Sequence, residues 1–173
     1  LCEHFPNVEV KELQEFQYSA AGKLGTNHSV LIAFLREHGV WGKRADAKRV
    51  PRAVWRAEPE VAAEFLAGLI ACDGSVALKA NGGIVISFAS INRDLVEDVA
   101  YLLLRFGIKT RLEHRLADSA CVFGARTAKS KELWSLRLAG VSDLARFCEH
   151  IHLRGRKGER QEYVLGELAG RIE

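Results

Sequence analysis

The sequence predicts an α+β fold in which helices cover one face of an antiparallel sheet and leave the other face open. From residue 59 onward, helical and strand-like segments follow in the order helix, two strands, helix, two strands, helix. Each strand-like segment alternates apolar residues with basic or small ones, so each has one apolar face for the helices. The opposite face of such a sheet is free to meet solvent or a partner.

Capping residues and apolar periodicity place the helices. Pro59 suits a first helical position and Gly74 a position just past the end, which predicts a helix over about residues 59–72. Ser90 or Asn92 can cap a second helix, whose apolar stripe stops at Gly107. The same signals predict three further helices, starting from Asn27 or Ser29 and ending at Gly39, over 142–151 with Ser142 as the cap, and over 159–172.

The predicted strands cover residues 75–79, 84–89, 108–115 and 133–138, and the segment 81–83 supplies the turn between the first two. Leu78 and Leu112 are expected on the apolar face. The open face is expected to carry basic, hydroxyl and small side chains, namely Ser75, Ala77, Lys79, Ser87, Lys109, Arg111, Arg115, Ser135 and Arg137. A two-stranded ribbon with such side chains fits the major groove of DNA, whereas an ordinary solvated sheet face would mix Glu with Lys more evenly.

Composition is that of a globular protein, with 48% apolar and 27% charged residues in 173. No apolar run approaches the roughly 18 residues of a membrane span. The four cysteines form no CxxC pair, which favours reduced thiols and a cytoplasmic protein. The net charge is only +3, but basic residues cluster at 36–56 and again at 109–137, where Arg126, Lys129 and Lys131 join those of the strands. Such clusters indicate a polyanionic partner or, alternatively, a solvated basic surface.

The stretch FLAGLIACDGSV contains an unexpected carboxylate. Asp73 ends the predicted helix, where the macrodipole is negative and an anion is disfavoured unless a positive charge lies beside it. The simplest interpretation is an Asp-Gly pair that starts the following hairpin.

This stretch also resembles the signature helix of the LAGLIDADG homing endonucleases, whose repeat has the same αββαββα order. LVEDVAYLLLRFGIKTRL and GRKGERQEYVL resemble later blocks of that repeat, and HGVWGKRADAKRVPRAVW resembles the junction between repeats in intein-encoded members, especially those of bacterial replicative helicases. The family motif usually has two acidic residues. Ala71 replaces the first and Asp73 retains the second, which holds the metal in this family.

The resemblance implies a fold whose sheet forms a saddle for DNA, and a site-specific double-stranded DNA endonuclease that reads a long target in the major groove. Asp73 and the backbone carbonyl of Cys72 are then expected to hold Mg²⁺ or Mn²⁺, because an all-oxygen pocket favours a hard divalent cation. Lys157 aligns with the family's lysine near the scissile phosphate. Lys48 resembles its counterpart from a first repeat, with Lys43 as the alternative.

The resemblance also implies two subdomains. We expect residues 1–53 to be the C-terminal part of a first LAGLIDADG subdomain and residues 54–173 to be a second, complete one. Cutting both strands needs a second carboxylate, which is expected from a signature helix upstream of Leu1 or, as the less favoured alternative, from a second copy of the chain. A DNA-binding module that has lost cleavage is the other function considered.

Overall fold

The structure is a computed structural model that describes residues 8–14, 17–22, 30–79, 83–117, 121–123, 126–128 and 131–172. The chain divides into two compact units, Leu1–Arg44 and Ala45–Glu173. This division concerns compactness and leaves the expected subdomain boundary at residue 53 a prediction.

The first unit contains a hairpin and a helix. Strands β1 (Val8–Gln14) and β2 (Gln17–Gly22) pair antiparallel, with a register irregularity between residues 12 and 14. Helix α1 (Val30–Glu37) lies within the span expected from the sequence. Gly39 follows it with a φ of 67°, a left-handed conformation that favours glycine after a helix.

The second unit carries the predicted αββαββα order. Helix α3 (Pro59–Asp73) precedes strands β3 (Gly74–Leu78) and β4 (Ile84–Ser90), and helix α4 (Arg93–Leu104) follows them. Strands β5 (Arg111–Arg115) and β8 (Leu133–Leu138) come next, and α5 (Val141–His150) completes the repeat. The unit begins with a short 3₁₀ turn (Ala45–Ala47) and α2 (Arg52–Arg56), and ends with α6 (Arg156–Ile172). The sequence-based fold class is confirmed.

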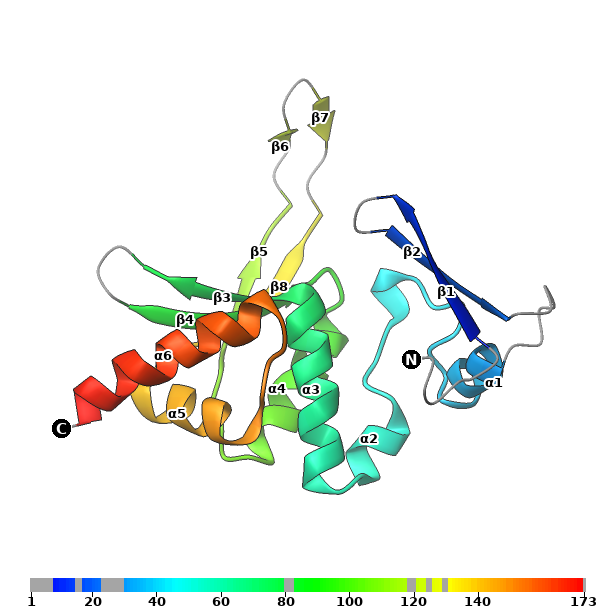
Figure 1. Cartoon of the computed structure of the whole chain (residues 1–173). Helices are drawn as coiled ribbons and strands as arrows, with labels where there is room; N and C mark the ends of the chain where they lie inside the picture. The colour runs from blue at the N-terminus through cyan, green and yellow to red at the C-terminus, as the bar shows by residue number, and fades with distance from the viewer. Residues whose placement is uncertain are drawn as a thin grey trace. The chain divides into compact units, whose positions relative to one another are not determined.

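The four strands form one antiparallel sheet in the order β3-β4-β8-β5. A separate hairpin of β6 (Cys121–Phe123) and β7 (Arg126–Ala128) is inserted between β5 and β8. Figure 1 shows the helices of this unit gathered on one side of the sheet. Among the described residues of this unit, the other side of the sheet carries no helix, as the alternation along the strands predicts.

The core lies between the sheet and the helices. Val76, Ile86, Phe88, Leu136 and Leu138 from the sheet are buried. The helices contribute apolar side chains at helical spacing, and the fully buried ones include Leu66, Ile70, Leu102, Leu103, Leu144 and Phe147. Among the described residues, no helix has the length and apolar character needed to cross a membrane.

Leu78 and Leu112 lie on the apolar face as expected, since they pair across the strands with the buried Ile84 and Leu136. Leu78 is nevertheless 48% and Leu112 46% exposed, because β3 and β5 are the edge strands of the sheet.

One local expectation was wrong. Helix α5 takes Gly140 as its N-cap in place of Ser142. The side chain of Asp143 in its first turn accepts a hydrogen bond from the Lys109 amide at 2.9 Å, which ties α5 to the segment before β5.

Candidate functional site

The C-terminus of α3 is bound by a lysine from α6. The Lys157 ammonium donates hydrogen bonds to the carbonyl oxygens of Ile70 at 3.1 Å, Ala71 at 2.6 Å and Cys72 at 3.3 Å. These carbonyls belong to the last turn of the helix, where intrahelical amide partners run out, and the Ile70 carbonyl also accepts from the Gly74 amide. A cation there also offsets the negative end of the macrodipole. The two residues that the sequence analysis singled out separately, Asp73 and Lys157, therefore meet at one helix end.

Asp73 is the last residue of α3, and its side chain is exposed. Within the described part of the chain its carboxylate accepts no hydrogen bond and forms no ion pair. Gly74 follows at a tight turn, since a Cβ there would lie 2.6 Å from the Ile70 side chain and 2.7 Å from its carbonyl oxygen. The helix thus passes directly into β3 and leaves the carboxylate projecting at the junction.

The start of α6 is fixed so that Lys157 can reach α3. A Cβ at Gly158 would lie 2.5 Å from the Leu153 carbonyl oxygen, so only glycine fits this close approach. The buried Gln161 donates to the Ile151 carbonyl at 2.6 Å and accepts from the Leu153 amide at 2.8 Å. One turn of α6 is therefore held against the segment that leads into it.

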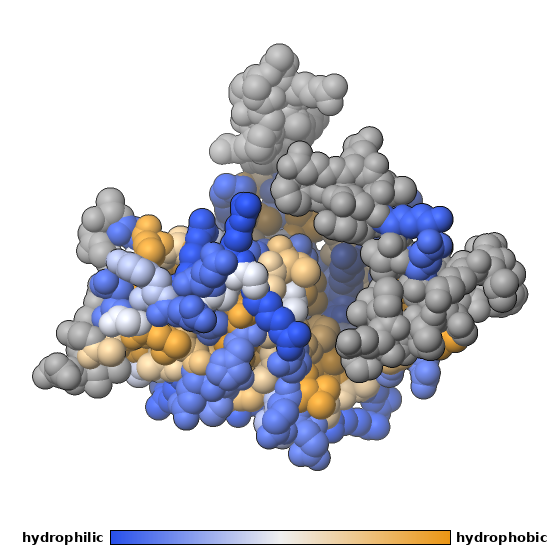
Figure 2. All heavy atoms as spheres, in the orientation of Figure 1, coloured by the Kyte–Doolittle hydropathy of each residue, from blue (hydrophilic) through white to orange (hydrophobic). Residues whose placement is uncertain are grey.

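The open face of the sheet brings together predicted residues from all four strands. Ser75 pairs with Ser87, Ser87 with Arg137, and Arg137 with Arg111, so the four form one row across the sheet. Figure 2 shows hydrophilic side chains over much of the surface seen in this view. A row of hydroxyl and guanidinium side chains on an open sheet face suits a duplex groove.

The sequence analysis left one acidic residue out of this face. Glu113 lies between Arg111 and Arg115 on β5 and opposite Ser135. Its carboxylate accepts from the Arg137 guanidinium at 3.2 and 3.3 Å, and Arg111 Nε lies 3.8 Å from it. Period-two alternation alone places Glu113 on the basic face, but its partner is set by cross-strand register, which the sequence does not display.

The other residues predicted to bind DNA have varied positions. Lys79 and Arg115 are exposed at strand ends, and Lys131 is exposed just before β8. Lys109 precedes β5 instead of lying within it, yet it lines the same cleft as Arg111. Arg126 belongs to β7 but its side chain lies outside the described part, as does the whole of Lys129.

The exposed stripe of α3 is rich in small residues. Gly68 has no atom within 4 Å of the place a Cβ would take. A shallow cleft of about 150 Å³ runs beside it, lined by Glu64, Ala67, Gly68, Ala71 and Arg154. Arg154 pairs with Glu64 at 2.9 Å at the edge of this stripe. The stripe leaves room for another backbone to approach closely.

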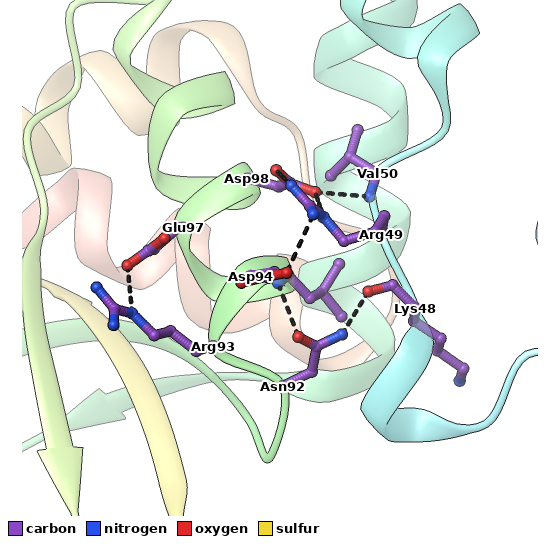
Figure 3. A network of polar contacts seen from close by, with 9 residues as sticks. Lys48, Arg49, Val50, Asn92, Arg93, Asp94, Glu97 and Asp98 are labelled. Atoms are coloured by element: carbon purple, nitrogen blue, oxygen red, sulfur yellow. Dashed lines mark hydrogen bonds and ion pairs between the residues drawn. The ribbon is translucent and has the colours of Figure 1, made fainter.

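Lys48 lies in a segment that is anchored to α4 (Figure 3). The Asn92 side-chain amide donates to the Lys48 carbonyl at 2.5 Å, and the Val50 amide donates to Asp98 at 3.1 Å. The Lys48 side chain itself is exposed and points away from these contacts (Figure 3). Within the described residues, no contact joins it to Asp73 or Lys157.

The adjacent Arg49 holds this segment most firmly. Its guanidinium donates to both oxygens of the buried Asp98 carboxylate at 2.7 Å and to Asp94 at 3.1 Å (Figure 3). The hydrogen bond to Asp98 raises the pKa of Arg49 well above its ordinary value, so the guanidinium keeps its charge. Sequence reasoning missed this clamp, because its two ends lie 49 residues apart and nothing local pairs them.

No group of three His, Cys, Asp or Glu side chains with the arrangement of a metal site occurs among the described residues. At the end of α3, Asp73 is thus a single carboxylate that does not belong to such a group. Beside it, the carbonyl oxygen of Cys72 faces Lys157.

Comparison with known proteins assigns the family. Residues 60–152, which run from the start of α3 to just past α5, match the LAGLIDADG-like domain. The chain is 31% identical over 137 residues to the replicative DNA helicase DnaB of Rhodothermus marinus, covering 78% of the chain and 13% of that protein. It is 26% identical over 130 residues to Protein RecA of Mycobacterium tuberculosis, covering 71% of the chain and 16% of that protein.

A third relative is the replication factor C small subunit of Methanocaldococcus jannaschii, 29% identical over 164 residues, which cover 95% of the chain and 8% of that protein. The chain thus spans less than a fifth of each of these relatives. The expected likeness to a segment of a bacterial replicative helicase is confirmed. Since the family match covers the signature helix, both strand pairs and the two helices that follow them, this chain belongs to the LAGLIDADG-like domain family.

Proposed function

We propose that this chain belongs to a site-specific double-stranded DNA endonuclease (a homing endonuclease), which hydrolyses phosphodiester bonds with the help of a divalent metal, and that it supplies one half of the catalytic site. The observation that carries the proposal is the exposed Asp73 carboxylate at the end of the signature helix, with the Lys157 ammonium bound one residue before it. Membership of the LAGLIDADG-like domain family supports a DNA-binding module of the homing-endonuclease type.

The residues at this helix end fit one half of a Mg²⁺ or Mn²⁺ site. Asp73 offers an exposed carboxylate, and the Cys72 carbonyl offers a second oxygen, which is the ligand chemistry these ions prefer. A bound divalent cation would lower the pKa of a water and offset charge on the scissile phosphate. Lys157 keeps a positive charge at the same place and orients the last turn of α3, so a phosphate arriving there meets a cation.

The second half of the site is proposed to come from another signature helix. An upstream repeat of the same polypeptide is the favoured source, with Lys48 as the candidate counterpart of Lys157. A second copy of the chain is the alternative. The exposed, small-residue stripe around Gly68 supports close packing of such a helix, because nothing lies within 4 Å of a Cβ built there.

DNA is proposed to lie across the open face of the sheet. The cross-sheet row from Ser75 to Arg111 ends at an exposed arginine, and Lys79 and Arg115 flank it. Since α3 leads directly into β3, Asp73 borders this face. A duplex bound there would bring its phosphate backbone close to the Asp73 carboxylate. A carboxylate on the helix-covered side of the sheet could not reach that backbone.

The chain is further proposed to be of the intein-encoded kind. Its relatives bear the names of proteins with different activities, yet each is matched over 8–16% of its length. A short segment shared by otherwise different proteins supports a mobile insertion rather than a shared enzymatic domain.

A DNA-binding module without cleavage is the second candidate, and it is favoured by the single signature carboxylate in the described chain. The natural full-length product, incubated with Mg²⁺ and a supercoiled plasmid that carries a selected target, separates the two. Nicked or linear product supports the nuclease. Tight binding without any product supports the binding module, and absence of duplex binding contradicts both.

A further inference from the structure

A carboxylate on a DNA-binding face repels phosphates, so Glu113 is costly there unless it does something else. It lies midway along β5 on the open face, flanked by two arginines of the same strand. The side chain of Glu113 is only 36% exposed. Both of its carboxylate oxygens accept hydrogen bonds from Arg137 on the neighbouring strand β8. Its position is therefore specific rather than that of a solvated rim residue.

Glu113 binds one arginine through two hydrogen bonds and contacts another only at a longer distance. Arg137, on the inner strand β8, donates from Nη1 to both carboxylate oxygens and is also 36% exposed. Arg111, its direct cross-strand partner, is 84% exposed and reaches Glu113 only at 3.8 Å. Both line an open cleft of about 390 Å³ together with Lys79, Lys109 and Asp143.

The two arginines differ in what they can recognise. Guanidinium has further N–H donors after Nη1 is engaged, and a bidentate contact to the O6 and N7 atoms of guanine is the commonest specific arginine contact in the major groove. Such a contact needs a guanidinium with a fixed plane. A long, unrestrained side chain instead finds the nearest phosphate, which carries no sequence information.

We propose that Glu113 is a positioning residue for sequence readout: it holds the Arg137 guanidinium so that Arg137 reads a guanine, while Arg111 contacts phosphate. The proposal rests on the proposed function, since it requires duplex DNA on the open face. The Glu113 side chain is expected to have opposite effects on DNA affinity and on base discrimination. Glu113 lowers affinity for DNA in general and raises discrimination at one base pair.

The test uses the whole chain and a library of randomised duplexes, from which bound DNA is selected and sequenced at a fixed salt concentration. Wild type is expected to enrich guanine at a position where Arg137→Ala loses the preference. Glu113→Gln should reduce that preference by roughly 5- to 150-fold, the value of a bidentate contact. The same variant should bind unselected duplex about two- to fivefold more tightly, because one negative charge is removed.

Matched variants separate positioning from charge and from folding. Glu97→Gln removes a carboxylate from the Arg93–Glu97 pair on α4 and should leave the base preference unchanged. Arg111→Ala should weaken binding to all sequences and reduce the salt slope by about one. Arg137→Lys keeps the charge without the planar fork, so it should retain affinity for unselected duplex and lose the guanine preference, even if the Glu113 variant is unstable.

Two results would overturn the inference while leaving the proposed function intact. One is an unchanged base preference in Glu113→Gln, and the other is an equal loss of affinity for every sequence. Failure of the wild-type chain to bind any duplex would contradict the proposed function itself.

Discussion

The Lys157 side chain offsets the unfavourable negative charge at the C-terminal end of α3. The last carbonyls of α3 and the carboxylate of Asp73 gather negative charge at one point, and the ammonium bound to three of those carbonyls offsets it. Lys157 therefore has a structural role in the folded chain, in addition to the catalytic role proposed for it. The two roles can be separated by measuring stability without DNA.

Replacing Lys157 by Met should lower the free energy of unfolding by about 1–2 kcal/mol, because the helix end loses its charged hydrogen-bond donor. Urea denaturation of the DNA-free chain measures this. Lys131→Met, which removes an exposed lysine before β8, is the control and should change stability by less than about 0.5 kcal/mol. Equal stability of the two variants would show that the contacts to α3 contribute nothing.

Gly158 offers a second test at the residue scale. Alanine there would put its Cβ 2.5 Å from the Leu153 carbonyl oxygen, so the first turn of α6 must move. We expect Gly158→Ala to cost about 1–3 kcal/mol of unfolding free energy. Gly166→Ala in the same helix, where a Cβ meets nothing within 4 Å, should instead stabilise the chain by about 0.5–1 kcal/mol. A stabilising Gly158→Ala would refute the close approach.

Among the elements, the segment that precedes α2 is held by contacts that sequence patterns cannot reveal. Asp98 is buried on α4, with only 9% of its side chain exposed, and receives the Arg49 guanidinium and the Val50 amide. These contacts fix the point at which the chain enters the second unit. A buried carboxylate with this many donors is destabilising once they are removed.

Asp98→Asn should lower the free energy of unfolding by about 1–3 kcal/mol and accelerate amide hydrogen exchange at Val50, whose acceptor is weakened. Asp94→Asn is the matched control, since it loses only the exposed contact at 3.1 Å and should cost less than about 1 kcal/mol. Faster exchange at Val50 in the control but not in Asp98→Asn would contradict this account of the clamp.

The elements that the sequence predicted are those with local signals. Pro59 and Gly74 bracket α3, Asn92 caps α4 by accepting from the Leu95 amide, and alternation identifies β8 as found. The β6–β7 hairpin was not predicted, because its strands are three residues each and too short for a period to emerge. Strand β5 starts three residues later than expected, since the segment before it is tied to Asp143.

The candidate site was predictable to a similar degree. Asp73 and Lys157 could be singled out from the motif blocks, but their meeting at one helix end depends on how α6 packs. The open face followed from alternation, whereas the Glu113–Arg137 pair depends on the register of β5 against β8. Local signals therefore identified the residues, and tertiary contacts determined which of them act together.

At the scale of the whole molecule, α3 presents an exposed stripe that the described residues of its own unit do not cover. Gly68→Ala should raise the free energy of unfolding of the chain by about 0.5–1 kcal/mol, because alanine is the better helix former and no atom opposes it. If another signature helix packs there, Gly68→Leu should abolish plasmid cleavage while the chain stays folded. Full cleavage by a folded Gly68→Leu variant would contradict a partner helix on this stripe.

The central claim is that Asp73 serves phosphodiester hydrolysis and not folding or DNA affinity. The most direct measurement compares wild type and Asp73→Asn, as natural full-length products, for Mg²⁺-dependent plasmid cleavage and for duplex binding. We predict a cleavage rate lowered by more than about a hundredfold, because the only signature carboxylate of this helix is lost. Duplex affinity should change by less than about threefold, since the basic face is untouched. Cleavage by Asp73→Asn at the wild-type rate would contradict the account.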